Sequence, residues 1–279
     1  MTGFVMALGD KSAGSNDSGT EAGTADRVAG TGSLRRAIEI LRALAMSREV
    51  GLGLSEMARL TGLPHPTVHR MLKALAAEGL VEQKRATRRY VVGEQIQFLA
   101  LSRERPSLLQ SEGERHITRA VEVLGDTVFL TQRTGLDTIC VARSLGTYPI
   151  QVLPLRVGDR RPLGVSSAGL ALLAALAPAE AEAILAENEA RLGAYRITGE
   201  IALGWVRAAR ELGYSLRDRG LVPGTRALSL AIRDGAGQPF AAVTIAGLAR
   251  RMPPARIESL VADMQVLAQA IERSLRRDS

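Results

Sequence analysis

The chain contains one cysteine, three histidines and few aromatic residues, and each scarcity excludes a class of protein. A disulfide scaffold needs at least two cysteines, so Cys140 cannot belong to one within this chain. It lies in an apolar run, which favours a small buried residue in a strand over a redox switch. A zinc site built from cysteine and histidine clusters is also excluded. Aromatic residues make up 3% of the chain and hydrophobic residues 46%, so we expect aliphatic cores.

Membrane-spanning segments and catalytic motifs are also missing from the sequence. The longest apolar-rich run, residues 168–177, is too short to cross a bilayer. The N-terminal residues lack a basic region and a cleavage site, so we expect no signal peptide, no membrane partner and a cytoplasmic location. Neither a G-x-S-x-G elbow nor a phosphate-binding P-loop occurs. His65 and His69 fall in one helical motif and His116 stands alone, so we expect no enzyme, no cofactor and no metal.

Residues 54–79 carry the strongest positive signal, two short amphipathic helices joined by a tight turn. Ser55 is expected to cap the first helix and to lie among the DNA-contacting residues, and Gly62 follows the end of that helix. Pro64 and Pro66 begin the second, where a missing amide donor costs little. Apolar residues at helical spacing face inward in that helix, and its opposite face carries Thr67, His69, Arg70 and Lys73. This arrangement predicts a helix-turn-helix whose second helix enters the DNA major groove.

A predicted hairpin with a basic tip follows the second helix. Residues 80–83 and 90–93 are typical of strands, and the tip between them carries Lys84, Arg85, Arg88 and Arg89. Such a wing suits contacts with phosphates or a minor groove, and a solvated basic loop is the alternative. Residues 33–105 contain thirteen basic and seven acidic residues, a net charge of +6, against −2 in residues 1–32 and +3 in residues 106–279. The positive charge therefore gathers around the predicted DNA reader.

The rest of the pattern divides the chain into four regions. Residues 1–32 are rich in small and polar residues and predict a disordered tail. Residues 33–93 form the winged helix-turn-helix, opened by a helix that Ser33 caps and on which Arg35 and Arg36 are placed to touch phosphate. Residues 94–106 are expected to form a linker helix. Residues 107–279 combine helices, hairpin-linked strands and an extended run at 150–155, which indicates an α+β fold with a mainly antiparallel sheet.

Several segments in this order and spacing resemble the IclR family of bacterial transcription regulators, from residue 33 to about residue 276. They read SLRRAIEIL at 33–41, LTGLPHPTVHRML at 60–72, YVVG at 90–93, RPLGVSSAGLALL at 161–173, GYS at 213–215, PGTRA at 223–227 and PFAAVTIA at 239–246. The resemblance implies that residues 107–279 are a GAF-like effector-binding and oligomerisation domain. It also implies homodimers or homotetramers on promoter DNA, and small organic-acid or aromatic effectors. It places the effector at Ile150, Leu153, Ser167, Ala168, Arg217, Thr225, Ala227, Thr244 and Ala246.

Alternatives remain open for the individual residues. Arg70 is expected to contact guanine or to clamp a phosphate, and Lys73 to reach phosphate, with a solvated surface position as the alternative. Thr67 is a phosphate contact or a local cap, and His69 faces the groove or packs beneath the wing. In the second domain, Ser166 and Ser167 either bind an anion at a helix start or cap that helix. Arg217 pairs with a ligand carboxylate or is an exposed strand residue.

The sequence therefore predicts a sequence-specific DNA-binding regulator. The resemblance implies control of catabolic genes by a small organic-acid or aromatic effector, with repression favoured and activation as the alternative. A ligand-independent architectural DNA binder is the first alternative. An enzyme with an attached DNA-binding domain is the second.

Overall fold

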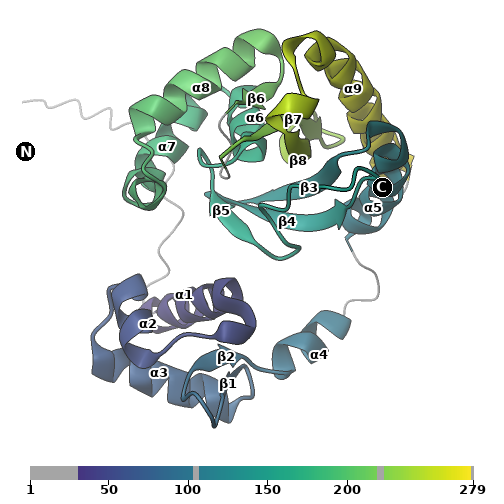
Figure 1. Cartoon of the computed structure of the whole chain (residues 1–279). Helices are drawn as coiled ribbons and strands as arrows, with labels where there is room; N and C mark the ends of the chain where they lie inside the picture. Colours follow the sequence, from purple (N-terminus) through teal and green to yellow (C-terminus); the bar gives the residue numbers. More distant parts are fainter. Residues whose placement is uncertain (1–30, 103–106, 219–222, 278–279) are drawn as a thin grey trace, which may run out of the picture.

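The chain forms two folded parts in sequence order (Figure 1). The computed structural model describes residues 31–102, 107–218 and 223–277. The predicted tail of residues 1–32 lies outside these ranges except at its end, where a helix already begins at Gly32. Ser33 is therefore a residue of the first helical turn and not its cap. Among the described residues, no helix has the length and apolar character that a membrane span requires.

The first part, residues 31–102, is a small helical unit with a two-stranded hairpin. Its elements are α1 (Gly32–Ser47), a short 3-10 helix (Arg48–Val50), α2 (Leu54–Thr61), α3 (His65–Ala77), β1 (Val81–Gln83), β2 (Tyr90–Val92) and α4 (Gln95–Leu101). Ile40 and Leu44 of α1 are fully buried against Met57, Val68 and Leu72. Each such side chain stabilises the unit by about 1.5–3 kcal/mol. The helical period expected from the sequence is thus confirmed in α1, α2 and α3.

Three details of this part differ from the expectations. The residue that caps α2 is Gly53, not Ser55, and the Gly53 amide donates to Glu56 Oε2 at 2.9 Å. Ser55 lies exposed in the first turn of α2. The expected linker helix is shorter, because α4 ends at Leu101, and residues 103–106 of that prediction lie outside the described residues.

The second part is built on a six-stranded antiparallel sheet with strand order β5-β4-β3-β8-β7-β6. In chain order its elements are α5 (Leu108–Leu124), β3 (Thr127–Thr134), β4 (Asp137–Ser144), β5 (Arg160–Pro162), α6 (Ser167–Ala175), α7 (Pro178–Leu192), a 3-10 turn (Gly193–Tyr195), α8 (Gly199–Leu212), β6 (Ser215–Arg217), β7 (Thr225–Arg233), β8 (Pro239–Leu248), a second 3-10 turn (Ala249–Arg251) and α9 (Pro254–Arg277). The expected α+β class is confirmed. The extended run at 150–155 is not a strand, and the short β5 is the edge strand that follows it.

The two faces of this sheet are covered by different helices (Figure 1). Side chains alternate along a strand, so Leu228, Leu230 and Ile232 of β7 face α5 and α9. Ala227 and Ser229 point to the other face, where α6 packs against β7 and β8. Helix α6 is buried from Ser167 to Leu173, because α7 and α8 cover its outer side. The order of layers is therefore α5 and α9, sheet, α6, then α7 and α8.

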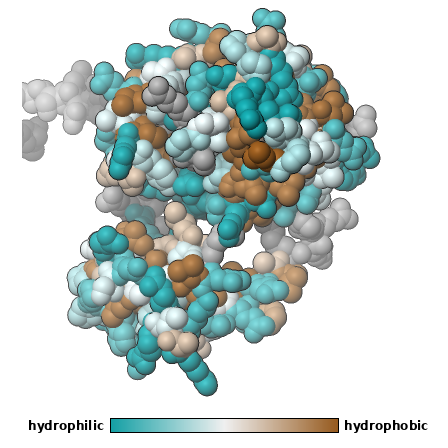
Figure 2. Space-filling model, viewed as in Figure 1, coloured by the Kyte–Doolittle hydropathy of each residue, from teal (hydrophilic) through white to brown (hydrophobic). Residues whose placement is uncertain are grey.

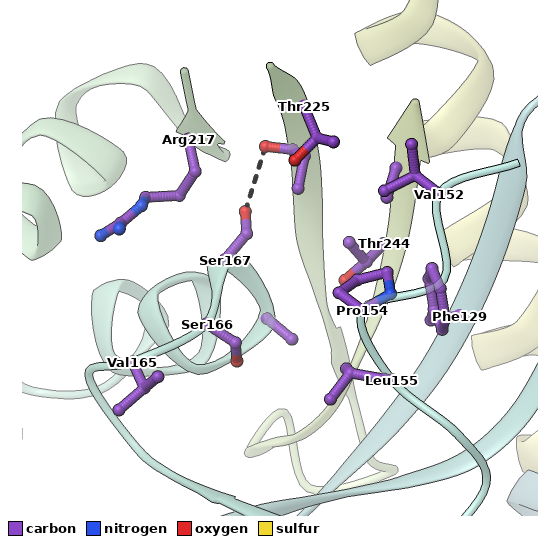
Figure 3. A pocket seen from close by; sticks show the side chains of 13 residues that line it. Phe129, Val152, Pro154, Leu155, Val165, Ser166, Ser167, Arg217, Thr225 and Thr244 are labelled. Carbon is purple, nitrogen blue, oxygen red and sulfur yellow. Dashed lines mark hydrogen bonds between the residues drawn. The ribbon is translucent and has the colours of Figure 1, made fainter. Parts of the chain in front are cut away.

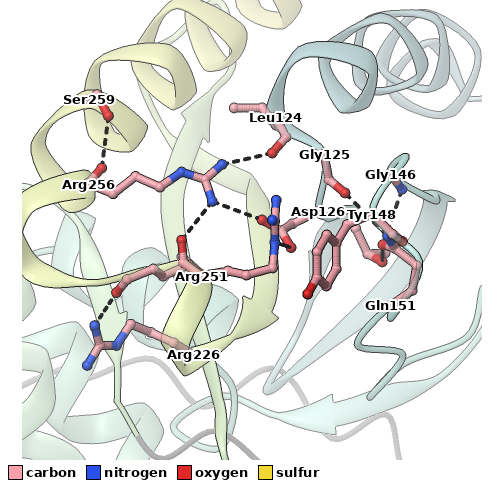
Figure 4. Close-up of polar contacts among 12 residues, drawn as sticks. Leu124, Gly125, Asp126, Gly146, Tyr148, Gln151, Arg226, Arg251, Arg256 and Ser259 are labelled. Atoms are coloured by element: carbon pink, nitrogen blue, oxygen red, sulfur yellow. Dashed lines mark hydrogen bonds and ion pairs between the residues drawn. The ribbon is translucent and has the colours of Figure 1, made fainter.

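A buried carboxylate joins the ends of four elements of this second part. Asp126, 1% exposed between α5 and β3, accepts from Arg251 Nε at 2.8 Å and from Arg256 Nη1 at 3.2 Å (Figure 4). Arg256 also donates to the Leu124 carbonyl at the end of α5, and Arg251 stacks on Tyr148 at 3.8 Å. The bond to Asp126 raises the pKa of the Arg251 guanidinium. A buried carboxylate needs such partners to offset its lost hydration.

Candidate functional site

Helix α3 presents a polar, cationic face to solvent. It starts after Gly62, whose φ of 66° lets the chain turn, and Pro64 occupies the N-cap position. Val68, Met71, Leu72 and Leu75 are buried beneath it. His69, Arg70 and Lys73 are exposed and Thr67 is half-buried. The sequence interpretation of this helix is thus reproduced, and His69 does not pack beneath the wing.

The hairpin divides its four basic residues into two groups. Strands β1 and β2 pair from Val81 to Gln83, and at the tip Arg85 and Arg88 extend into solvent. Lys84 instead donates through Nζ to the Glu49 carbonyl. Arg89 donates to the Gly51 carbonyl at 3.0 Å and to Glu56 Oε2 at 2.6 Å.

Lys84 and Arg89 therefore fasten the wing to the preceding helical segment, and their expected role as DNA contacts stays a prediction. Arg89 is the more fully engaged of the two, because its guanidinium donates to the Val50 and Gly51 carbonyls and to Glu56. Lys84 is exposed and uses one of its three donors on the Glu49 carbonyl. Arg89 and the Gly53 amide lower the pKa of Glu56, the amide contributing most. The sequence analysis missed Glu56 because its partner Arg89 lies 33 residues further along the chain.

Arg35 and Arg36 lie exposed at the start of α1. Ser55 is exposed in the first turn of α2. Nothing inside the described fold engages their side chains, so all three are open to solvent.

A small cavity lies in the second part between α6 and the sheet (Figure 3). Register explains its inner wall: Phe129 of β3 pairs with Thr244 of β8, and Ala246 of β8 pairs with Ala227 of β7. These side chains therefore share one face of the sheet. The complete lining is Phe129, Val152, Pro154, Leu155, Val165, Ser166, Ser167, Ala168, Arg217, Thr225, Ala227, Thr244 and Ala246.

The start of α6 brings two serines to the cavity. Gly164 turns the chain before them with a φ of 102°, and a Cβ there would lie 2.7 Å from Leu185. Ser166 caps α6, since its hydroxyl accepts from the Gly169 amide at 3.2 Å. The Ser167 hydroxyl lies 3.2 Å from the Ser215 carbonyl and 3.3 Å from the Ala227 carbonyl. The cap alternative is thus realised at Ser166, whereas Ser167 ties α6 to β6 and β7.

Arg217 is the cationic residue of the cavity lining. Its side chain extends away from Phe129, Val152 and Thr244 (Figure 3). The guanidinium carbon lies 3.6 Å from the ring centre of Trp205 on α8, a cation–π contact. Burial lowers the pKa of Arg217 because the charged form is partly desolvated. Arg217 is therefore half-buried at the edge of the cavity, which removes the alternative of an exposed strand residue.

The outer wall of the cavity is the loop between β4 and β5. Arg143 donates to the Leu155 carbonyl at 3.2 Å and Arg161 to the Pro154 carbonyl at 3.4 Å, which fixes the loop over the sheet. Val152 and Leu155 are buried. Ile150 and Leu153 are 52% and 48% exposed and do not line the cavity, which corrects both predictions.

The physical reason is that residues 150–155 form an irregular loop without strand alternation, in which Val152 and Leu155 turn inward and Ile150 and Leu153 stay in solvent. The other seven predicted effector residues all line the cavity. The sequence analysis missed Phe129, Val152, Pro154, Leu155 and Val165. Nothing in the local pattern distinguishes these apolar residues from ordinary core.

The cavity has a volume of about 40 Å³. A single water needs about 10–15 Å³ by this measure, so the space suits a few waters. An organic acid would require the loop over β4 and β5, or the Arg217 side chain, to move. With the walls moved, Phe129 and the alanines would offer an apolar surface, and Arg217 would offer a charge-assisted hydrogen bond to an anionic group.

Comparison with known proteins decides the class of this chain. Residues 33–85 match the IclR helix-turn-helix domain, and residues 109–273 match the C-terminal region of the bacterial transcriptional regulator IclR. The chain belongs to the IclR family. It is 30% identical to the transcriptional regulator BhcR of Paracoccus denitrificans, over 83% of this chain and 82% of that protein. It is 27% identical to the transcriptional repressor IclR of Escherichia coli, over 81% and 83% of the two chains.

Solved structures of the family share the fold. An IclR-type regulator from Silicibacter sp. has a TM-score of 0.73 at 20% identity, covering 88% of this chain and 96% of that one. An IclR homologue from Microbacterium hydrocarbonoxydans, solved with 4-hydroxybenzoate, has a TM-score of 0.64 at 23% identity, covering 88% and 99%. The expected family and fold class are confirmed. This chain is a DNA-binding transcriptional regulator with an effector-binding domain, and not an enzyme.

Proposed function

We propose that this IclR-family regulator represses catabolic genes by reading promoter DNA with α3, and that a small organic or aromatic acid controls it. The observation that carries the proposal is the presence in one chain of a solvent-facing cationic helix and a cavity edged by Arg217. The binding of 4-hydroxybenzoate by a structural neighbour supports an aromatic acid as one ligand class. The exposed cations of the wing, Arg85 and Arg88, would contact phosphates and add affinity without sequence preference.

Control by a ligand requires that the ligand bind one arrangement of the DNA-binding domains more tightly than another. Helix α4 lies between the two parts of the chain and is the element through which we propose that the arrangement changes. The present cavity is too small for an organic acid. Binding of such a ligand would therefore require the walls of the cavity to move.

We further propose that the regulator works as a homodimer or homotetramer on paired half-sites. Helices α1 and α4 leave large apolar side chains in water, including Leu34 of α1 and Phe98 and Leu101 of α4. Figure 2 shows apolar residues at the surface where α4 lies. Multi-angle light scattering measures the mass directly, and a monomer at all concentrations would contradict this assembly.

Titration of labelled DNA from upstream of the gene and its neighbours tests the proposal. Wild type is expected to prefer the upstream sequence over scrambled DNA, with affinity that falls as salt rises. Arg70→Ala is expected to cost about 1–3 kcal/mol on the upstream DNA and little on scrambled DNA. Arg207→Ala, which removes an exposed charge on α8, is the matched control and should bind as wild type does.

Aromatic and organic acids are then added to the preformed complex. If one class of acid weakens or strengthens the binding of the protein to DNA, the result supports effector control. Specific DNA binding that no acid changes would leave the architectural alternative. If wild type and Arg70→Ala both bind the upstream and the scrambled DNA equally weakly, the proposal that Arg70 contacts bases is overturned.

A further inference from the structure

We propose that this regulator recognises guanine-containing half-sites, with Arg70 and Lys73 donating hydrogen bonds to guanine O6 and N7 in the major groove. The inference rests on the proposed function and names the base that α3 reads. It follows from the hydrogen-bond donors that the exposed face of α3 carries and from the amide and carboxylate side chains that this helix does not contain.

The face opposite the core of α3 is defined by helical geometry. Pro66, Arg70, Lys73 and Ala77 follow one another at intervals of three or four residues and so lie in one row. All four are exposed, and His69 lies exposed beside the row. The buried residues of α3 occupy the opposite side. A helix docked in a groove by this face presents this row to the base edges.

Helix α3 contains neither an amide that pairs bidentately with adenine nor a carboxylate that accepts from cytosine. Its hydroxyl, on the half-buried Thr67, can contact any base and so selects none. Its sequence, HPTVHRMLKALAA, has no asparagine, glutamine, aspartate or glutamate. Adenine is read by a paired donor and acceptor, as in the Asn or Gln amide, and cytosine by an acceptor such as a carboxylate. Guanine offers two acceptors, which match the donors of arginine and lysine. The small apolar residues Pro66 and Ala77 can contact thymine methyl groups but form no hydrogen bond.

The two donor side chains are available for this contact. In the described part of the chain, neither the Arg70 nor the Lys73 side chain makes a hydrogen bond or an ion pair. Lys84 and Arg89 of the wing differ, since both are held by oxygens of the fold. Arg85 and Arg88 at the wing tip remain to neutralise phosphates, which leaves Arg70 and Lys73 free to read bases.

The position of Arg70 in the helix ranks it above Lys73. Recognition helices contact base edges with their N-terminal residues, and Arg70 lies in the second turn of α3. Lys73 lies one turn later and carries a single point charge, whereas the planar guanidinium can donate two parallel bonds. Arg70 should therefore dictate one guanine strictly, and Lys73 a neighbouring guanine less strictly.

Selection from a random DNA pool with the full-length protein is the first test. Wild type is expected to enrich half-sites in which at least one guanine is invariant. Selection with Arg70→Ala should lose the preference at that position, and Lys73→Ala should relax a neighbouring one. Arg207→Ala is the control and should return the wild-type site. Thermal unfolding of each variant confirms folding, because the substituted side chains are exposed.

Base analogues in the selected site give the second test. Replacing the invariant guanine by 7-deazaguanine removes the N7 acceptor and is expected to weaken wild-type binding about fivefold or more. The same replacement should change Arg70→Ala binding little. Inosine keeps O6 and N7 and should leave wild-type affinity within about twofold.

The outcomes separate this inference from the proposed function. Enriched sites whose invariant positions are adenine–thymine pairs would overturn the guanine assignment while leaving a sequence-specific regulator. Indifference of wild type to 7-deazaguanine at every guanine would also overturn it, because Arg70 would then bind phosphate. No enrichment of any sequence would overturn the proposed function itself.

Discussion

Two arginines of the wing illustrate how position decides the role of a residue. Arg89 binds the Gly51 carbonyl and Glu56, whereas Arg85 is exposed at the tip. We expect Arg89→Ala to lower the free energy of unfolding of the N-terminal unit by about 1–2 kcal/mol, mainly through its half-buried backbone bonds. Arg85→Ala should leave stability unchanged and reduce the salt dependence of DNA binding by about one ion.

Chemical denaturation and DNA titration at several salt concentrations measure both effects of the wing variants. Equal stability of the two variants would contradict the assignment of Arg89 to the fold.

Asp126 is the residue whose replacement should cost most. Asp126→Asn keeps the shape but removes the charge that Arg251 and Arg256 share. Leaving these arginines uncompensated is expected to cost about 2–4 kcal/mol and to lower Tm by about 5–15 °C. Asp263→Asn, on the exposed face of α9, is the control and should change stability by less than about 0.5 kcal/mol. Scanning calorimetry measures both variants, and a Tm of Asp126→Asn near wild type would contradict the network.

At the scale of elements, α5 packs closely on the sheet at Gly113. A Cβ at Gly113 of α5 would lie 2.2 Å from Leu130 Cδ2, and Leu130 is fully buried. Gly113→Ala should therefore destabilise by about 1–3 kcal/mol, although alanine favours helix by about 1 kcal/mol. Gly204 of α8 has no atom within 4 Å of such a Cβ. Gly204→Ala should stabilise by about 0.5–1 kcal/mol, and denaturation curves showing the same sign for both would contradict the packing.

The elements also show what sequence alone could predict. Helices α1 to α3 were predictable because apolar spacing, proline and glycine act within a few residues. The resemblance supplied most of the cavity, including Thr244 and Ala246. The inward side of residues 150–155 was not predictable, because the contacts that orient that loop come from Arg143 and Arg161 on other strands. Likewise, nothing near Arg89 in the sequence indicates that it binds α2.

At the scale of the whole molecule, the cavity and DNA binding should respond to one ligand together. Trp205 is the single tryptophan of the chain, and Arg217 stacks on it. A carboxylate bound by Arg217 would draw the guanidinium from the ring, so tryptophan emission should change at the ligand concentration that changes DNA affinity. Fluorescence and anisotropy titrations measure both, with Arg217→Met as the variant that should lose both responses. A ligand that alters DNA binding with no change in emission would exclude Arg217 from its site.

The residues of the inner wall of the cavity are also part of the hydrophobic core. Phe129 and Ala246 of the sheet and Ala168 of α6 are almost fully buried, whereas Pro154 and Arg217 border the cavity from a loop and an edge strand. Substitution of Phe129, Ala168 or Ala246 would disturb core packing and lower stability, even where it improves the fit of a ligand. Diversification of ligand preference within this lineage, and engineering of the protein as a biosensor, should therefore proceed through the loop and the edge strand. The buried wall would limit the shape of the ligands that the cavity accepts.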